Sequence, residues 1–234
     1  MKTLISAALL LLTQYGLAQQ NLNGAWKLSP ANGEPQTVRI IEDSYFMQTH
    51  FDEKGKQFLS THGGKLEASG SSGLKETIEF HTADKEKVGT VRDCTYQLNN
   101  NQLVITCNGQ ASTWQRVDDG KAPLAGAWRI TARENGGSMV PMRPGPRKTL
   151  KILSGTRFQW AAINTETKEF FGTGGGTYTF ENGKYTENIT FFSRDSTRVG
   201  AALSFDGKVD GKQWHHSGKS SKGDPISEIW SRIE

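Results

Sequence analysis

The sequence predicts an all-β fold built from two related domains, and three observations support that prediction. A motif near the start of the chain returns 102 residues later, apolar and polar residues alternate along several segments, and turn-forming residue pairs recur at short spacing. Alternation with a period of two places one face of each strand on a core. A chain of 234 residues is long enough for two domains of ordinary size.

The duplication is visible at the start, in the middle and at the end of each copy. The matched segments are 22–27 (LNGAWK) and 124–129 (LAGAWR), 76–80 (ETIEF) and 187–191 (ENITF), and 114–117 (WQRV) and 230–233 (WSRI). The offset grows from 102 to 111 to 116 residues, so the second copy carries insertions. We predict one domain over residues 19–119 and another over residues 120–234, joined near residues 118–123.

Both copies show the pattern of short antiparallel strands. Residues 37–40, 98–106 and 185–191 alternate between apolar and polar side chains. Turn signals occur at Asn108–Gly109, Asn182–Gly183, Asp206–Gly207 and Asp210–Gly211. Roughly eight to ten such strands per copy fit a closed antiparallel barrel, which leaves no exposed sheet edge.

Residues 1–18 are predicted to be a cleaved signal peptide. Lys2 is followed by an apolar run over residues 4–12, and the small residues Gly16 and Ala18 precede the expected cleavage site. No cysteine follows that site, so a lipid anchor is not expected. We therefore expect an exported protein, periplasmic or secreted, in a compartment that permits disulfides.

Cys94 and Cys107 are predicted to form a disulfide across a hairpin. If Asn100–Asn101 is a two-residue turn, each residue pairs with the one equally distant from the turn, and the two cysteines face each other. The second copy has Phe205 and Gly218 near the corresponding positions. The bridge is therefore expected to be a local feature of the first copy.

The first and last strands of each copy resemble the pattern of lipocalins and, more broadly, calycins. The matching residues are Gly24, Trp26 and Arg116 in the first copy and Gly126, Trp128 and Arg232 in the second. In that family the tryptophan plugs the closed end of the barrel and the arginine stacks across it. The resemblance implies two tandem antiparallel lipocalin-like barrels after the signal peptide, with these residues in structural roles.

A second resemblance concerns the second copy in particular. Residues 174–180 (GGGTYTF), 185–187 (YTE) and 214–219 (WHHSGK) are similar to a family of exported bacterial lipocalin-like domains whose function is unassigned. This resemblance implies a β-barrel and export, and brings no activity with it. Each copy is shorter than a typical lipocalin and lacks its C-terminal helix, so a barrel filled by its own side chains is the alternative to a ligand cavity.

The candidate ligand-binding residues all lie in the second copy, which is richer in large amphipathic aromatic residues. They are Trp160, Tyr178, Tyr185, Glu187, Trp214 and His216. Aromatic side chains with a polar tip either fill a core or line a concave site, and both interpretations stay open.

Glu187 and His216 are the candidate residues that titrate. The strand face predicted for Glu187 also carries Tyr185, Ile189 and Phe191. A carboxylate on an apolar face needs a partner, so Glu187 is either a ligand anchor or base, or a structural group tied to an arginine or tyrosine. Its repetition as Glu76 favours the structural role. By alternation, His216 points inward and His215 outward.

The second copy also has an enlarged first loop and an excess of basic residues. The loop includes residues 136–148 and, in lipocalin-like barrels, covers the open mouth; we expect either a lid or a surface loop without a role. Residues 120–234 hold 17 basic and 11 acidic side chains, against 10 and 13 in residues 19–119. This excess favours an anionic ligand or an envelope surface. Together with the aromatic residues, it leads us to expect a small apolar or anionic ligand as the partner. The basic residues are scattered, so nucleic-acid binding is not expected.

These observations predict an exported, non-catalytic protein that binds a small apolar or mixed aromatic–polar molecule in the second copy. One alternative is a barrel enzyme, an isomerase or hydrolase with Glu187 and His216 as acid and base. Another is an envelope interaction module with filled barrels. Motifs of serine hydrolases, zinc proteases and phosphate-binding loops are missing from the sequence. No metal or cofactor is expected, since zinc requires three or four ligands, and no transmembrane segment is expected either. The oligomeric state is left open.

Overall fold

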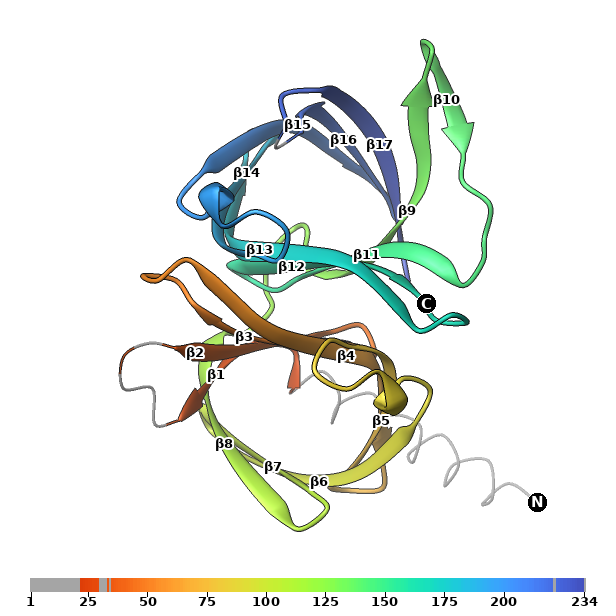
Figure 1. The fold of residues 1–234 in the computed structure, drawn as a ribbon. Helices are drawn as coiled ribbons and strands as arrows, with labels where there is room; N and C mark the ends of the chain where they lie inside the picture. The colour runs from red at the N-terminus through yellow and green to blue at the C-terminus, as the bar shows by residue number, and fades with distance from the viewer. Residues whose placement is uncertain (1–21, 30–32, 34, 221, 234) are drawn as a thin grey trace, which may run out of the picture.

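The structure is a computed structural model that describes residues 22–29, 33, 35–220 and 222–233. Strands account for 69% of the residues and helices for 3%, which confirms the all-β prediction. Figure 1 shows two rings of strands, one above the other. The predicted signal peptide lies outside the described residues.

Barrel 1 is a closed antiparallel barrel of eight strands, in which β1 pairs with both β2 and β8. The strands follow one another around the barrel in chain order. They are β1 (Gly24–Ser29), β2 (Gln36–Glu42), β3 (Tyr45–Asp52), β4 (Gln57–Ser69), β5 (Gly73–His81), β6 (Val91–Asn99), β7 (Gln102–Cys107) and β8 (Gln110–Asp118). A 3-10 turn, η1 (Lys85–Lys87), joins β5 to β6.

Barrel 2 repeats this arrangement and adds one strand. β9 pairs with β11 and β17, which closes the barrel, and β10 pairs with the far end of β9 as a hairpin. The strands are β9 (Gly126–Asn135), β10 (Ser138–Pro141), β11 (Arg147–Leu153), β12 (Arg157–Asn164), β13 (Glu169–Glu181), β14 (Lys184–Phe192), β15 (Ala202–Asp210), β16 (Gln213–Lys219) and β17 (Pro225–Arg232). The turn η2 (Ser196–Arg198) takes the place of η1. Two closed eight-strand barrels in tandem are a lipocalin-like fold.

The six residues of the lipocalin pattern lie on the first and last strands of each barrel. They are Gly24, Trp26 and Arg116 in barrel 1, and Gly126, Trp128 and Arg232 in barrel 2. The guanidinium carbon lies 4.0 Å from the tryptophan ring centroid in barrel 1 and 4.7 Å in barrel 2. Each indole N–H donates a 2.9 Å hydrogen bond to the carbonyl four residues earlier in the chain. The glycines have φ values of +121° and +146°, which favour glycine over any other residue.

A glycine pair bends the long strand of each barrel. The register shifts between Gly63 and Gly64 in β4 and between Gly175 and Gly176 in β13. A Cβ on Gly64 or Gly176 would lie 1.9 Å from a backbone carbonyl oxygen of the neighbouring strand. The run of glycines at residues 174–176 lies inside β13 and therefore permits a bulge at a barrel corner.

The same bulge turns Phe191 away from the face that carries Glu187. Tyr185 and Ile189 belong to the core of barrel 2, as the alternation predicts. Phe191 instead packs against Phe51 of barrel 1, with ring centroids 4.8 Å apart. The prediction that Phe191 shares the face of Glu187 is wrong, because a period of two does not hold across a β-bulge.

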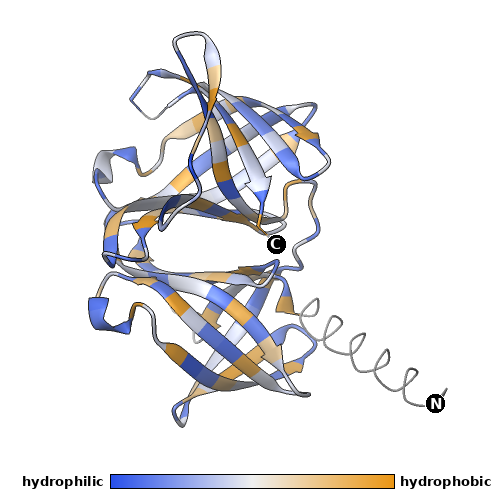
Figure 2. Cartoon of the chain, turned by 90° about the vertical axis from the view of Figure 1, so that its right-hand side faces the viewer, coloured by the Kyte–Doolittle hydropathy of each residue, from blue (hydrophilic) through white to orange (hydrophobic). Residues whose placement is uncertain are grey.

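The two barrels pack against each other through their outer walls (Figures 1 and 2). Polar bonds cross this interface: Thr49 Oγ1 donates to Gln159 Oε1 at 2.8 Å, and Lys148 Nζ donates to Glu79 Oε1 at 2.8 Å. One apolar cluster contains buried residues of both barrels, among them Val38, Ile40, Met47, Phe51, Leu150, Ile152, Ala161 and Phe191. Strands of both barrels therefore bury side chains on two faces, one inside the barrel and one against its neighbour.

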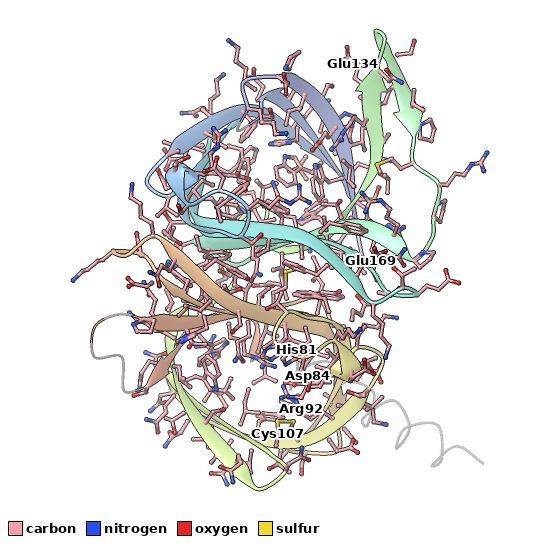
Figure 3. The ribbon with its side chains drawn as sticks, in the orientation of Figure 1. His81, Asp84, Arg92, Cys107, Glu134 and Glu169 are labelled. Atoms are coloured by element: carbon pink, nitrogen blue, oxygen red, sulfur yellow. A yellow bond between two sulfur atoms is a disulfide. The ribbon has the colours of Figure 1, made fainter. Side chains whose placement is uncertain are left out.

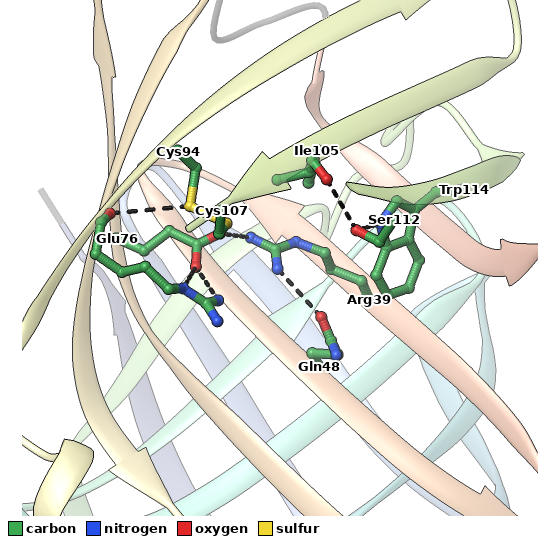
Figure 4. Close-up of a disulfide and its surroundings, with 9 residues drawn as sticks. Arg39, Gln48, Glu76, Cys94, Ile105, Cys107, Ser112 and Trp114 are labelled. Carbon is green, nitrogen blue, oxygen red and sulfur yellow. Dashed lines mark hydrogen bonds and ion pairs between the residues drawn. A yellow bond between two sulfur atoms is a disulfide. The ribbon is translucent and has the colours of Figure 1, made fainter. Parts of the chain in front are cut away.

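The predicted disulfide is confirmed. Cys94 on β6 and Cys107 on β7 lie directly opposite each other, and their sulfur atoms are bonded. The turn between the two strands contains Asn100 with a φ of +53°, as a tight hairpin requires. Figure 4 shows the bridge beside Glu76 and Arg39 in barrel 1.

Candidate functional site

Barrel 2 contains a cavity of about 780 Å³. Residues 133–136 of the β9–β10 hairpin line it, so it lies at the end of the barrel from which that hairpin projects (Figure 1). Small-molecule sites have volumes of about 300–1,000 Å³. Its apolar wall is formed by Trp160, Ala162, Ile189, Phe192, Leu203, Phe205, Ile226 and Trp230. Four buried ionisable side chains also line it, and we call them the polar floor: Lys151, Glu187, His216 and Glu228.

Lys151 and Glu187 form an ion pair in the polar floor. Lys151 Nζ donates to Glu187 Oε1 at 2.8 Å, and the Tyr185 hydroxyl donates to the same oxygen at 2.9 Å. Lys151 Nζ also lies 5.0–5.8 Å from the centroids of four aromatic rings, whose faces stabilise a cation. Burial and the charge of Glu187 raise the pKa of Tyr185 well above its usual value. The Tyr185 hydroxyl therefore keeps its proton and acts as a donor.

His216 and Glu228 face each other across β16 and β17. His216 Nδ1 lies 3.5 Å from Glu228 Oε2. Arg133 Nη2 donates to Glu228 Oε1 at 2.6 Å, and Trp230 Nε1 donates to Glu228 Oε2 at 3.0 Å. Burial alone raises the pKa of Glu228, but contact with His216 and the charge of Arg133 lower it to about 2. The Glu228 carboxylate is therefore ionised and held in place at neutral pH.

The imidazole of His216 is neutral at pH 7, because burial lowers its pKa. Its ring packs among those of Phe205, Trp214 and Tyr185, with centroid distances of 4.2, 5.1 and 5.7 Å. Within the part of the chain that the structure describes, neither ring nitrogen makes a hydrogen bond. His216 is buried and His215 is exposed, which confirms the predicted alternation. A buried polar group without a hydrogen bond is unfavourable, so His216 is the least satisfied member of the polar floor.

The structure divides the six predicted site residues into two groups. Three line the cavity: Trp160, Glu187 and His216. Three are buried in the core of barrel 2: Tyr178, Tyr185 and Trp214. The Tyr178 hydroxyl donates to the carbonyl oxygen of Ser154 at 2.5 Å. Tyr178 therefore holds the end of β11 through the Ser154 carbonyl, and Tyr185 holds Glu187 of the polar floor in place.

Sequence reasoning missed the charged partners in the polar floor. Lys151 interrupts the apolar run of residues 150–153, as Arg39 interrupts residues 38–41 in barrel 1. This repeated interruption was a signal for an inward-facing cation opposite Glu187. Glu228 stands two residues before the closing Trp230 motif, where barrel 1 has Ser112, and no repeat marks it.

Barrel 1 holds the equivalent carboxylate, Glu76, between two arginines. Arg39 and Arg92 both donate to it through their Nη2 atoms, and Arg92 Nε donates at 2.9 Å. Burial alone raises the pKa of Glu76, but the two positive charges outweigh it and lower the pKa. Arg92 and Cys107 lie within the ring of barrel 1 in Figure 3. Glu76 is therefore a structural group, tied to arginines in the core.

Glu76, Cys94 and Cys107 bring three ligand atoms within 4.8 Å of one another. The two sulfur atoms are bonded to each other, so neither is available as a thiolate ligand. We assign no metal site to this group.

Comparison with protein-family models gave no match, and comparison with curated proteins gave no match either. Among the described residues, none of the helices has the length and apolar character needed to cross a membrane.

Proposed function

We propose that the chain is a non-catalytic binding protein that holds a small apolar or mixed aromatic–polar molecule in barrel 2. The observation that carries this proposal is the 780 Å³ cavity, whose wall is aromatic and aliphatic and whose polar floor is buried. Apolar side chains around a few fixed polar groups are the usual composition of a small-molecule site.

The wall supports a ligand with a flat apolar body. Trp160 and Phe192 meet edge to face with centroids 5.6 Å apart, and both line the cavity. Burying such a body removes apolar surface from water, at about 25 cal/mol per Å². The lining includes charged residues of both signs: Arg133, Arg147, Arg194, Glu134 and Asp224. The arginines can bind an anionic group of a ligand, but the apolar wall can also bind a ligand that has no charge.

Export to the periplasm or the exterior belongs to the same proposal. It is supported by the signal-like composition of residues 1–18 and by the Cys94–Cys107 disulfide, since disulfides persist in oxidising compartments. The resemblance to exported bacterial lipocalin-like domains points the same way.

The decisive variant transfers a feature of barrel 1 into barrel 2. Leu203 faces Glu187 across the strands as Arg92 faces Glu76. Leu203→Arg should therefore place a guanidinium beside Glu187 and fill the cavity. The control is Leu59→Arg, which adds the same charge at an exposed leucine of barrel 1.

Tryptophan fluorescence and native mass spectrometry are then followed across a panel of fatty alcohols, fatty acids, aromatic alcohols, sugars and tetrapyrroles. We expect saturable binding of at least one amphipathic compound, about tenfold or more weaker in Leu203→Arg and unchanged in Leu59→Arg. A flat response of the parent protein across the panel, or equal binding by Leu203→Arg, would overturn the proposal.

A second candidate function is catalysis, and the His216–Glu228 pair favours it. Glu228 Oε2 lies 3.5 Å from His216 Nδ1, and a carboxylate this close to a neutral imidazole in a cavity would orient a general base once the contact shortens to a hydrogen bond. Glu187 is bound to Lys151 and Tyr185, so an isomerase or hydrolase here would use His216 with Glu228 as its orienting group. Turnover of a bound compound that is abolished in Glu228→Gln, with binding retained, would favour this second function.

A further inference from the structure

The hairpin of β9 and β10 is a feature of barrel 2 that has no counterpart among the strands described for barrel 1. It projects beyond the ring of barrel 2 on the side away from barrel 1 (Figures 1 and 2), and Glu134 marks its outer part in Figure 3. Gly136 and Gly137 form its turn, with φ values of +61° and +81°. All four residues of β10 are exposed, and β10 pairs only with β9.

Exposed apolar side chains are concentrated on this hairpin. Six large hydrophobic side chains are exposed among the described residues, and three of them fall within four positions: Met139 at 39%, Val140 at 46% and Met142 at 44%. The other three are spread over barrel 1, at Leu59, Val91 and Val117. Scattered exposed hydrophobic residues are ordinary, whereas a cluster on a projecting element marks an interaction site.

The charge around this cluster is positive. Residues 129–148 contain five basic side chains and one acidic side chain. Arg133 and Lys148 are paired with Glu228 and Glu79. The other three are Arg129, Arg143 and Arg147; within the described part of the chain they make no ion pair. An apolar tip flanked by unpaired arginines complements an anionic surface with an apolar interior.

We propose that the β9–β10 hairpin docks barrel 2 on an anionic lipid surface. Met139, Val140 and Met142 enter the boundary between headgroups and acyl chains, and the exposed Arg143 and Arg147 contact the phosphates. Arg129 is half-buried and donates to the carbonyl oxygen of Gly145 at 3.0 Å, so it contributes charge without a direct contact. Residues 133–136 of the same hairpin line the cavity. Docking therefore brings the cavity mouth to the lipid, so that an apolar ligand can pass between them without crossing water.

The test measures binding of the full chain to vesicles. Sedimentation is followed with vesicles of phosphatidylcholine alone and of phosphatidylcholine mixed with phosphatidylglycerol. The hairpin variant is Met139→Ser/Val140→Ser/Met142→Ser, and the matched control is Leu59→Ser/Val91→Ser/Val117→Ser. Both variants replace three exposed hydrophobic side chains, so they differ only in where the apolar surface is lost.

We expect the parent and the control to bind the mixed vesicles, and the hairpin variant to bind about tenfold more weakly. Binding should weaken on phosphatidylcholine alone and, for Arg143→Glu, on the mixed vesicles. Equal binding by the parent and the hairpin variant overturns the proposal, as does an absence of binding by the parent. Self-association of the parent that the hairpin variant loses, without vesicle binding, would assign the hairpin to a second copy of the chain and also overturn it.

Discussion

Barrel 1 and barrel 2 share one architecture and differ in what occupies their interiors. Both are closed by a stacked tryptophan and arginine, and both bend at a glycine pair. In barrel 1, two arginines hold the inward glutamate next to a disulfide. In barrel 2, the equivalent glutamate has one lysine and one tyrosine as partners, and a cavity lies beside it. A barrel with a cross-linked interior and a barrel with a cavity therefore share one fold and differ at a few interior positions.

The cross-strand register identifies those substitutions. The equivalent pairs are Arg39 and Lys151, Arg92 and Leu203, Cys94 and Phe205, Ile105 and His216, Cys107 and Gly218, and Ser112 and Glu228. Phe205 and Gly218 replace the two cysteines, so the interior of barrel 2 lacks the cross-link, and Leu203 replaces an arginine that would hold Glu187. Gain of a histidine and a glutamate adds two buried groups that titrate. Five of these residues of barrel 2 line the cavity: Lys151, Leu203, Phe205, His216 and Glu228.

The largest effect is expected from removing the carboxylate in each interior. Glu76→Gln leaves Arg39 buried without a counter-ion, and Glu187→Gln does the same to Lys151. Breaking a buried ion pair from one side costs roughly 3–5 kcal/mol. We expect both variants to lose about that much unfolding free energy near pH 7, measured by urea denaturation.

The two variants test the same ion-pair interpretation in the two interiors. A loss of less than about 1 kcal/mol in either variant would contradict the view that its carboxylate compensates a buried cation.

The disulfide gives the next largest effect. Cys94 and Cys107 are 13 residues apart, and a loop of that size contributes about 3 kcal/mol by restricting the unfolded chain. Cys94→Ala/Cys107→Ala should lose about that much unfolding free energy and retain the ligand affinity of barrel 2. Urea unfolding and ligand titration of the same samples provide the two readouts. If barrel 2 keeps its parent stability while barrel 1 unfolds separately, the shared interface does not couple the barrels.

Much of this fold could be predicted because the repeat and the strand pattern are local properties of the sequence. The hairpin that joins Cys94 to Cys107 follows from its turn and its alternation. The face of β2 does not follow in the same way: Val38 and Ile40 point to the other barrel, and Arg39 points inside its own. When both faces of a strand are buried, its sequence pattern does not show which face points into the barrel.

The site was less predictable than the fold. Aromatic content and strand alternation pointed to six residues of barrel 2, and three of them line its cavity: Trp160, Glu187 and His216. Phe192 was missed because a bulge in the β13–β14 pairing shifts the alternation of β14. Glu228 was missed because its bond with Arg133 joins β9 to β17, which are distant in sequence, and its bond with Trp230 depends on which face of β17 points inward. Partners of buried charges are set by pairing between strands, which a single sequence does not display.

The smallest effect concerns Glu42, at the junction of the two barrels, where barrel 2 has Ser154 at the equivalent position. Burial and the charges of Asp43 and Asp118 raise the pKa of Glu42 to about 9, although Arg232 opposes them. The side chain is therefore protonated in the folded chain at neutral pH. Glu42→Gln keeps its size and hydrogen-bonding shape and removes the titration.

Because the pKa of Glu42 is raised on folding, its contribution to stability is fully present below the usual pKa of a glutamate and is lost as the pH rises through about 9. Glu42→Gln should thus be nearly neutral near about pH 4 and stabilise the protein by about 2 kcal/mol near about pH 6. Urea unfolding at several pH values measures this difference. A gain that does not change with pH would assign the effect to packing. A gain that grows with pH would show that crowded carboxyl groups limit stability at the junction of the barrels. In the two interiors, by contrast, each buried carboxylate is stabilised by a positively charged partner.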